Sequence, residues 1–197
     1  MNYTNELISI GPRALSYPNP VMLIATFDEN KIPDIMAASW YGICCSEPPC
    51  VNVSVRKARK TYDNLILNNC FTVLVPSEEM VMEADFTGIY SGHKVDKCKE
   101  LDLKYTNSEI IDAPVIEGFP ILLECKVINK IELGSHTQFI GRILDIKVNK
   151  SLIENKKIPT IKDVKPFVYD SGTRAYYSIG KFLGDAYKIG LKSNINT

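Results

Sequence analysis

The chain has 197 residues, with 23 basic and 23 acidic side chains and a formal net charge of zero at pH 7. Hydrophobic residues make up 45% of it and charged residues 23%, a balance that is typical of globular proteins and excludes disordered and low-complexity classes. The missing basic surplus argues against nucleic acid as a partner, and no apolar run approaches the roughly 20 residues of a membrane helix.

The first quarter of the chain predicts short strands joined by turns. Residues 21–27 predict a buried strand, residues 28–31 a turn and residues 34–40 a returning strand. We expect a loop after Trp40, ended by Pro48-Pro49, because proline cannot donate to a strand ladder. Residues 50–56 then alternate, which predicts core positions for Val51, Val53 and Val55 and an opposite face with Ser54 and Arg56.

The remaining elements complete a mainly β pattern. Apolar spacing predicts a helix from about residue 60 to 68, a strand over 70–75, a helix from Ser77 that ends before Gly88, and a short helix over 95–101. Residues 121–133 and 137–148 predict a long hairpin that turns at Gly134-Ser135, and residues 176–179 predict a late strand. Many antiparallel strands with few helices favour a β-barrel with peripheral helices.

The six cysteines do not indicate a disulfide framework or a metal site. They contain no CxxC motif, and Cys44-Cys45 are adjacent. The N-terminus also lacks the long apolar core of a secretory signal. We therefore expect reduced thiols, mostly small buried hydrophobes, no metal, and a cytoplasmic location.

The segment from Ser54 to Thr61 is the most informative for chemistry. Four of the five residues from 56 to 60 are basic, and they lie between a strand end and a helix start. Unpaired N–H groups and the helix dipole favour an anion there, and Arg56 can bind two phosphate oxygens at once. The segment fits a pocket for one phosphate group and, equally well, a solvated basic turn.

Other chemical signals are weak when each is taken alone. No GxGxxG or GxxxxGK[ST] fingerprint is present. His93 is expected at the surface, and a lone His136 at a strand start is more often structural than catalytic. Asp85 and the pair Asp96-Lys97 are expected to be solvated charges.

Taken together and in order, several motifs resemble those of the flavin reductase-like, FMN-binding split-barrel family and its flavoredoxin branch. The matching stretches are Pro20–Thr26, Ala38–Gly42, Pro48-Pro49, Val53–Arg56, Lys60-Thr61, Ala84–Gly88, Ser91-Gly92, Asp96-Lys97, Gly134–Thr137 and Phe139–Gly141, with Tyr177 and Gly180 near the end. The resemblance covers about residues 18–181 and implies one domain over 1–197, with a tail over 182–197.

The resemblance implies an FMN-binding split barrel that works as a homodimer. It implies a flavin reductase or flavoredoxin-type electron carrier, which takes electrons from NAD(P)H or from a redox partner protein. The family's phosphate-binding positions correspond to Ser54, Arg56, Lys60 and Thr61.

The resemblance also implies residues around the flavin ring. Ser39 and Trp40 would lie along the ring or the ribityl chain, and Tyr169 would cover the ring from the C-terminal segment. Lys97 and His136 would approach the ring and act in catalysis, Lys97 by stabilising the reduced anion.

Two positions depart from the family pattern. Asp34 stands where the family often has Asn, so this acid either points away from the flavin or lowers its potential. The pair Cys44-Cys45 matches no family role. Two alternatives also stay open: a non-catalytic flavin- or haem-binding module on the same barrel, and an interaction protein whose basic turn is only solvated.

Overall fold

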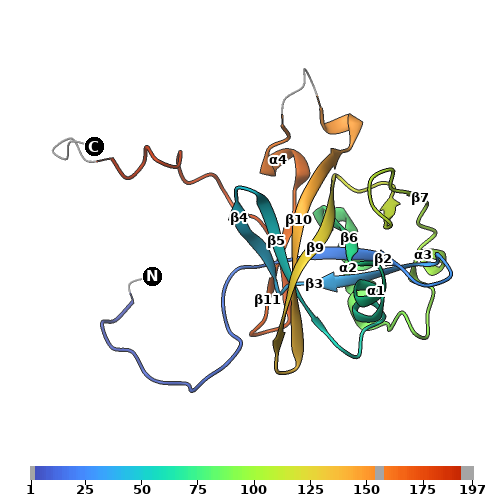
Figure 1. The fold of residues 1–197 in the computed structure, drawn as a ribbon. Coiled ribbons are helices and arrows are strands. Elements are labelled where there is room, and N and C mark those ends of the chain that lie inside the picture. Colours follow the sequence, from blue (N-terminus) through green and yellow to red (C-terminus); the bar gives the residue numbers. More distant parts are fainter. Residues whose placement is uncertain (1–2, 154–157, 192–197) are drawn as a thin grey trace.

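The computed structural model describes residues 3–153 and 158–191 (Figure 1). Its main element is a seven-stranded antiparallel sheet with the strand order β3-β2-β6-β9-β10-β5-β4. In chain order these strands are β2 (Met22–Phe27), β3 (Pro33–Ala38), β4 (Tyr41–Ser46), β5 (Pro49–Arg56), β6 (Cys70–Val75), β9 (Ile121–Leu133) and β10 (His136–Val148). The prediction of a mainly β fold with peripheral helices is confirmed.

The sheet curls around a core to which strands near both of its edges contribute. Met36 and Ala38 of β3 share one buried cluster with Val51, Val53 and Val55 of β5, although these strands are far apart in the strand order. Within the described residues no backbone ladder joins the edge strands β3 and β4, so the barrel is open along this seam.

Strand β2 is buried on both faces. Ile24 packs into the cluster inside the curled sheet, whereas Leu23 and Ala25 pack into a second cluster outside it. The second cluster includes Ala84 and Cys98, which the helices on the outer face supply. A strand covered on both sides reads as a continuous apolar run, which is the pattern of residues 21–25.

The hairpin of β9 and β10 is the longest element of the sheet (Figure 1). It turns at Gly134-Ser135, where Gly134 has a φ of +52°, a conformation that favours glycine. Packing also requires glycine at position 141 of β10, because a Cβ there would lie 2.5 Å from Cζ of the buried Phe71. The predicted hairpin is confirmed, with β10 beginning at His136.

The other elements surround this sheet. A second sheet has the order β1-β11-β12, and β7 pairs with β8. The helices are α1 (Lys60–Asn68), α2 (Val81–Ile89), α3 (Lys97–Glu100) and α4 (Ile161–Val164), with 3-10 turns η1 (Glu78–Met80) and η2 (Lys150–Leu152). The short strands are β1 (Asn19–Pro20), β7 (Tyr105–Asn107), β8 (Pro114–Ile116), β11 (Phe167–Asp170) and β12 (Ala175–Ser178).

Several boundaries differ from the sequence prediction, two of them for a clear structural reason. The expected loop after Trp40 contains strand β4, an edge strand. Its Tyr41 packs against the core, but Ile43, Cys44 and Cys45 are all exposed, so its pattern lacks the usual alternation. Helix α2 continues through Gly88 to Ile89. Gly88 serves close packing instead of ending the helix, because a Cβ there would lie 3.4 Å from Cβ of Ala37 on β3.

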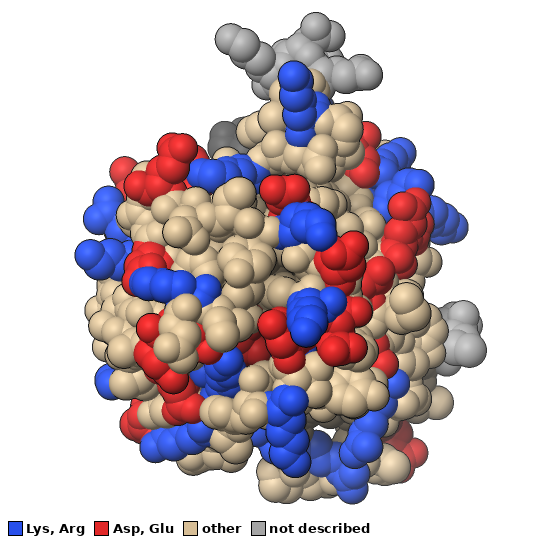
Figure 2. All heavy atoms as spheres, turned by 90° about the vertical axis from the view of Figure 1, so that its right-hand side faces the viewer, with Lys and Arg blue, Asp and Glu red and all other residues tan. Residues whose placement is uncertain are grey.

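Charges of both signs are interspersed over the face on the right-hand side of Figure 1, as Figure 2 shows. Such mixing agrees with the equal numbers of basic and acidic residues. None of the helices in the described residues combines the length and the apolar character needed to cross a membrane.

Candidate functional site

A cavity of about 710 Å³ lies where the end of β3, the end of β5, helix α2 and the small sheet of β11 and β12 meet. Its polar and aromatic lining side chains come from segments that are far apart in the sequence: Ser39, Trp40, Ser54, Arg56, Arg59, Asp85, His136, Tyr169, Arg174 and Tyr176. This volume is large enough for a small organic cofactor.

Strand β5 supplies two of these side chains by simple alternation. Val53 and Val55 are at most 1% exposed and point into the core, which leaves Ser54 and Arg56 on the other face. The N–H of Ser54 donates to the carbonyl of Trp40 at 2.9 Å, and this bond holds the Trp40 segment beside β5. A hydroxyl, a guanidinium and an indole therefore lie side by side at this wall of the cavity.

His136 begins β10 directly opposite Arg56 in the strand register. Its Nδ1 lies 2.9 Å from Oγ of Ser135. Burial, followed by the positive charge of Arg56, lowers the pKa of His136 from its ordinary value. The imidazole is therefore neutral at pH 7 and offers the cavity one donor and one acceptor nitrogen.

The C-terminal segment supplies an aromatic wall. The rings of Tyr169 on β11 and Tyr176 on β12 have centroids 5.7 Å apart. The hydroxyl of Tyr176 donates to Oδ1 of Asp85 at 2.9 Å, and this bond ties the small sheet to α2. Burial is the largest cause that raises the pKa of Tyr176, and Asp85 adds to it, so the phenol stays protonated.

Arginine side chains give the lining of the cavity a net positive charge. Arg59 is the residue before α1, and its guanidinium donates to the carbonyl of Gly88 on α2 at 3.3 Å. With Arg56 and Arg174, three guanidinium groups line the cavity, whereas Asp85 is the acidic side chain in its lining. This donor set fits an anionic ligand, because guanidinium groups bind phosphate and carboxylate oxygens with paired hydrogen bonds.

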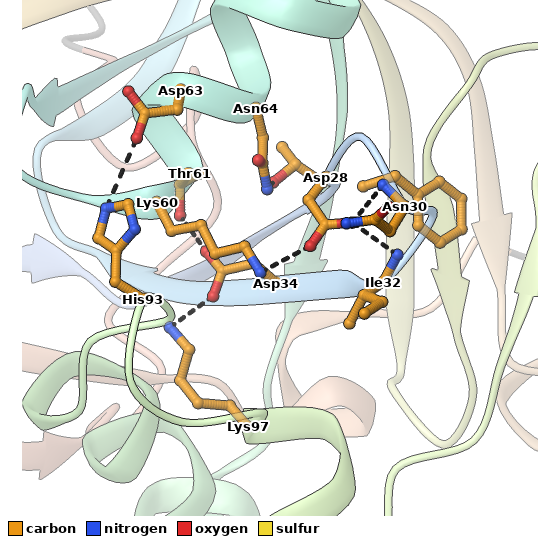
Figure 3. Close-up of polar contacts among 12 residues, drawn as sticks. Asp28, Asn30, Ile32, Asp34, Lys60, Thr61, Asp63, Asn64, His93 and Lys97 are labelled. Carbon is orange, nitrogen blue, oxygen red and sulfur yellow. Dashed lines mark hydrogen bonds and ion pairs between the residues drawn. The ribbon is translucent and has the colours of Figure 1, made fainter.

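A second network of polar side chains, none of which belongs to the cavity lining, lies around the start of α1 (Figure 3). Oδ1 of Asp34 lies 3.0 Å from Nζ of Lys97, and Oδ2 of Asp34 accepts a hydrogen bond of 2.7 Å from the hydroxyl of Thr61. Nearby, Nζ of Lys60 lies 2.8 Å from Oδ2 of Asp28. These contacts join β3, α1, α3 and the turn after β2, and they engage the charged groups of Asp28, Asp34, Lys60 and Lys97.

Comparison with known proteins identifies the family. A family model described as "Flavin reductase like domain" matches residues 14–178. The chain belongs to this family. An uncharacterised protein of Archaeoglobus fulgidus is 31% identical over 132 residues, which are 66% of this chain and 72% of that protein.

Solved structures of the flavin reductase-like family are similar over nearly the whole chain. Flavoredoxin of Desulfovibrio vulgaris (Miyazaki F) has a TM-score of 0.88 and 43% identity, over 94% of this chain and 100% of that one. Flavoredoxin from Methanosarcina acetivorans has a TM-score of 0.87 and 29% identity, over 94% of this chain and 97% of that one. The resemblance to the family and to its flavoredoxin branch is confirmed.

The structure divides the sequence-predicted residues of this flavin reductase-like chain into two groups. The lining of the cavity includes six of them: Ser39, Trp40, Ser54, Arg56, His136 and Tyr169. The buried network next to α1 contains the other four: Asp34, Lys60, Thr61 and Lys97. The flavin contacts that the resemblance implies for all ten stay predictions.

Two predictions from isolated motifs are wrong. Lys97 is 2% exposed instead of solvated, and burial lowers its pKa, although the Asp34 carboxylate opposes this effect. Asp85 is half-buried and bound to Tyr176 instead of being a solvated charge. Of the two histidines, His93 is at the surface, as predicted.

Sequence reasoning missed four lining residues: Arg59, Asp85, Arg174 and Tyr176. Arg59 belongs to the basic run that was singled out, but nothing in the run distinguishes it from Lys60. Arg174 and Tyr176 come from a segment more than a hundred residues later, and no local pattern places them at the cavity.

Proposed function

We propose that this chain is an FMN-binding redox protein that holds its cofactor in the cavity between β3, β5, α2 and β11. The observation that carries the proposal is the lining, which combines three guanidinium groups with the aromatic side chains of Trp40, Tyr169 and Tyr176. A phosphate group and a planar ring system are the two parts of FMN that such a lining suits.

The phosphate of FMN would be held by Ser54, Arg56 and Arg59. These side chains share the cavity wall at the end of β5 and the start of α1, where the helix dipole also favours an anion. Lys60 and Thr61, which the resemblance assigns to the phosphate, are engaged with Asp28 and Asp34 instead. Their contribution would be to hold the start of α1 in place.

The ring of FMN would lie near Ser39, Trp40, His136 and Tyr169. When bound, FMN supplies the redox chemistry, because it accepts two electrons as a hydride and releases them singly or in pairs. The protein contributes binding, orientation and charge. The neutral imidazole of His136 would hydrogen-bond to the cofactor or to an arriving nicotinamide without adding a charge.

Electrons would come from NAD(P)H or from a redox partner protein. The 43% identity to a flavoredoxin supports a carrier, and the match to the flavin reductase-like family model supports reduction by a nicotinamide. We propose the carrier as the principal role, with NAD(P)H-dependent flavin reduction as the second candidate.

A homodimer is part of the proposal. The outer parts of β9 and β10 expose the apolar side chains of Ile128, Ile131, Leu144 and Ile146, which solvent-facing strands seldom carry together. A second copy of the chain would cover them. Light scattering coupled to size exclusion tests this, and a monomer mass at micromolar concentration would overturn it.

The visible absorption spectrum of the purified protein tests the function. We expect the bands of oxidised flavin, either as purified or after FMN is added. Anaerobic NADH and NADPH are then added separately. Bands bleached by one nucleotide would support the reductase and name its donor, whereas bands that neither bleaches would support a carrier that another protein reduces.

Three outcomes count against the proposal. A colourless protein that also fails to bind added FMN would overturn it. A bound flavin that no nucleotide and no redox partner reduces would favour the non-catalytic flavin-binding module. Haem bands in place of flavin bands would point to the haem-binding module instead.

A further inference from the structure

The tip of the β4–β5 hairpin gathers three cysteines. Cys44 and Cys45 lie near the end of β4, and Cys50 lies near the start of β5. The strand register places Cys45 directly opposite Cys50, while Cys44 falls at a shift of the register between Ile43 and Cys45. The pair that the fold forms is therefore Cys45 with Cys50, and not the two neighbours in the sequence.

The spacing of this pair suits a disulfide. Directly opposite residues of an antiparallel ladder have Cα atoms about 4.5–5.5 Å apart, which lies within the roughly 4.4–6.8 Å that a disulfide needs. Their side chains also point to the same face of the sheet. Both thiols turn toward the hairpin loop, because Sγ of Cys45 donates to the carbonyl of Glu47 and Sγ of Cys50 to that of Pro48, each at 3.4 Å.

The two thiols differ in access to solvent. Cys45 is exposed on an edge strand, whereas Cys50 is 3% exposed. Burial and the nearby thiols of Cys45 and Cys44 raise the pKa of Cys50, and the guanidinium of Arg142, opposite Cys50 on β10, acts in the other direction. This asymmetry assigns Cys45 as the attacking thiol and Cys50 as the resolving thiol, as in dithiol sites that react with external disulfides.

We propose that Cys45 and Cys50 form a redox-active dithiol that undergoes exchange with small-molecule disulfides of the glutathione type. The Cys45 thiolate attacks one sulfur of the small disulfide, forms a mixed disulfide and releases one small thiol. The Cys50 sulfur then attacks Sγ of Cys45, closes the protein disulfide and releases the second small thiol. The protein dithiol loses two electrons and two protons, and the small disulfide gains both.

The dithiol is separate from the cavity. Cys50 and Arg56 stand six residues apart on β5, which at roughly 3.3 Å per residue places them about 20 Å from each other. Among the described residues no group of three or more His, Cys, Asp or Glu side chains is arranged to hold a metal, so the cysteines are not explained as metal ligands. The inference does not depend on the proposed function.

The experiment oxidises native protein with glutathione disulfide. Reduced protein is equilibrated at graded ratios of glutathione disulfide to glutathione, remaining thiols are alkylated, and tryptic peptides are analysed by mass without reduction. Trypsin leaves all three cysteines in one peptide, residues 32–56, since no Lys or Arg lies between Lys31 and Arg56. The variants Cys44→Ser and Cys45→Ser, both at exposed positions, form the matched pair, and Cys50→Ala is the third variant.

We expect the 32–56 peptide of the wild type to lose two hydrogen masses and to carry one alkyl group, on Cys44. Cys44→Ser should form the disulfide as the wild type does, and Cys45→Ser should lose it. Cys50→Ala, checked for folding by circular dichroism, should instead accumulate a glutathione adduct on Cys45.

Two results would overturn the proposal. One is a disulfide that persists in Cys45→Ser and disappears in Cys44→Ser. The other is native wild-type protein that stays reduced at ratios that oxidise the same protein in denaturant.

Discussion

Nζ of Lys97 lies 3.0 Å from Oδ1 of Asp34, and both side chains are at most 3% exposed. The pair connects α3 to β3, and the hydroxyl of Thr61 brings α1 into the same network. We expect Lys97→Met to lower the free energy of unfolding by about 3–5 kcal/mol, because it leaves the Asp34 carboxylate buried without its counter-charge. Urea denaturation measures this change.

The double variant Asp34→Leu/Lys97→Met provides the control. It removes both charges, so we expect much of the lost stability to return. The prediction would be contradicted if the free energy of unfolding of the single variant Lys97→Met were within about 1 kcal/mol of the wild-type value. The double variant also tests the catalytic role that the resemblance implies for Lys97, because it contains no unpaired buried charge that would disturb the fold. If Lys97 stabilises the reduced flavin anion, the reduction potential of bound flavin should be lower in this variant than in the wild type.

The pair of Asp28 and Lys60 predicts a pH dependence of stability. Burial tends to raise the pKa of Asp28, but hydrogen bonds from Lys60 and from the N–H groups of Ile32 and Asn30 lower it below its ordinary value. The ionised form of Asp28 is therefore more stable in the folded chain than in the unfolded chain. The stabilisation is present above about pH 4 and is lost as the pH falls through the lowered pKa.

Replacing Asp28 by Asn should flatten this part of the curve of unfolding free energy against pH. Asp112→Asn is the matched control, because Asp112 pairs with Lys31 at the surface, where ion pairs contribute at most about 1 kcal/mol. Equal acid sensitivity of the wild type and Asp28→Asn would show that this carboxylate does not carry the effect.

Arg56 should dominate the binding of FMN phosphate. We expect Arg56→Ala to raise the Kd for FMN about 10- to 100-fold, since a hydrogen bond to a charged group contributes about 1.5–3 kcal/mol. Fluorescence quenching of free FMN measures the Kd. Arg142→Ala removes an exposed arginine elsewhere on the sheet and should leave it unchanged, so equal losses in both variants would speak against a specific phosphate site.

His136 should titrate below its ordinary pKa of about 6.5, because burial and Arg56 disfavour the protonated ring. The unfolded chain takes up this proton at a higher pH than the folded chain. The free energy of unfolding should therefore fall as the pH drops from about 6.5 through the lowered pKa.

NMR titration of the two imidazoles, assigned with His93→Gln, measures the pKa of His136 directly. Arg56→Ala should shift this pKa upward by removing the nearby positive charge. A midpoint at or above the ordinary value in the wild type would contradict the burial seen here.

Local pattern determined most of the sheet and a few residues of the cavity lining; the resemblance to the family supplied Ser39, Trp40 and Tyr169. The alternation of residues 50–56 predicts that Ser54 and Arg56 share a face opposite the core valines, and the structure places both at the cavity. The two long apolar stretches around Gly134 predict the central hairpin and place His136 at its turn. These features follow from strand periodicity and turn chemistry, which act over a few residues.

Tertiary structure decided which charged residues reach the cavity. Arg59, Lys60 and Thr61 are consecutive, but Arg59 has an extended backbone before the helix, whereas Lys60 and Thr61 belong to its first turn. Arg59 therefore lines the cavity while its neighbours bind Asp28 and Asp34. Arg174 and Tyr176 reach the cavity only because β11 pairs with β12. The same holds for Cys45, whose partner in the fold is Cys50 and not its neighbour Cys44, because strand register is set by pairing across the sheet.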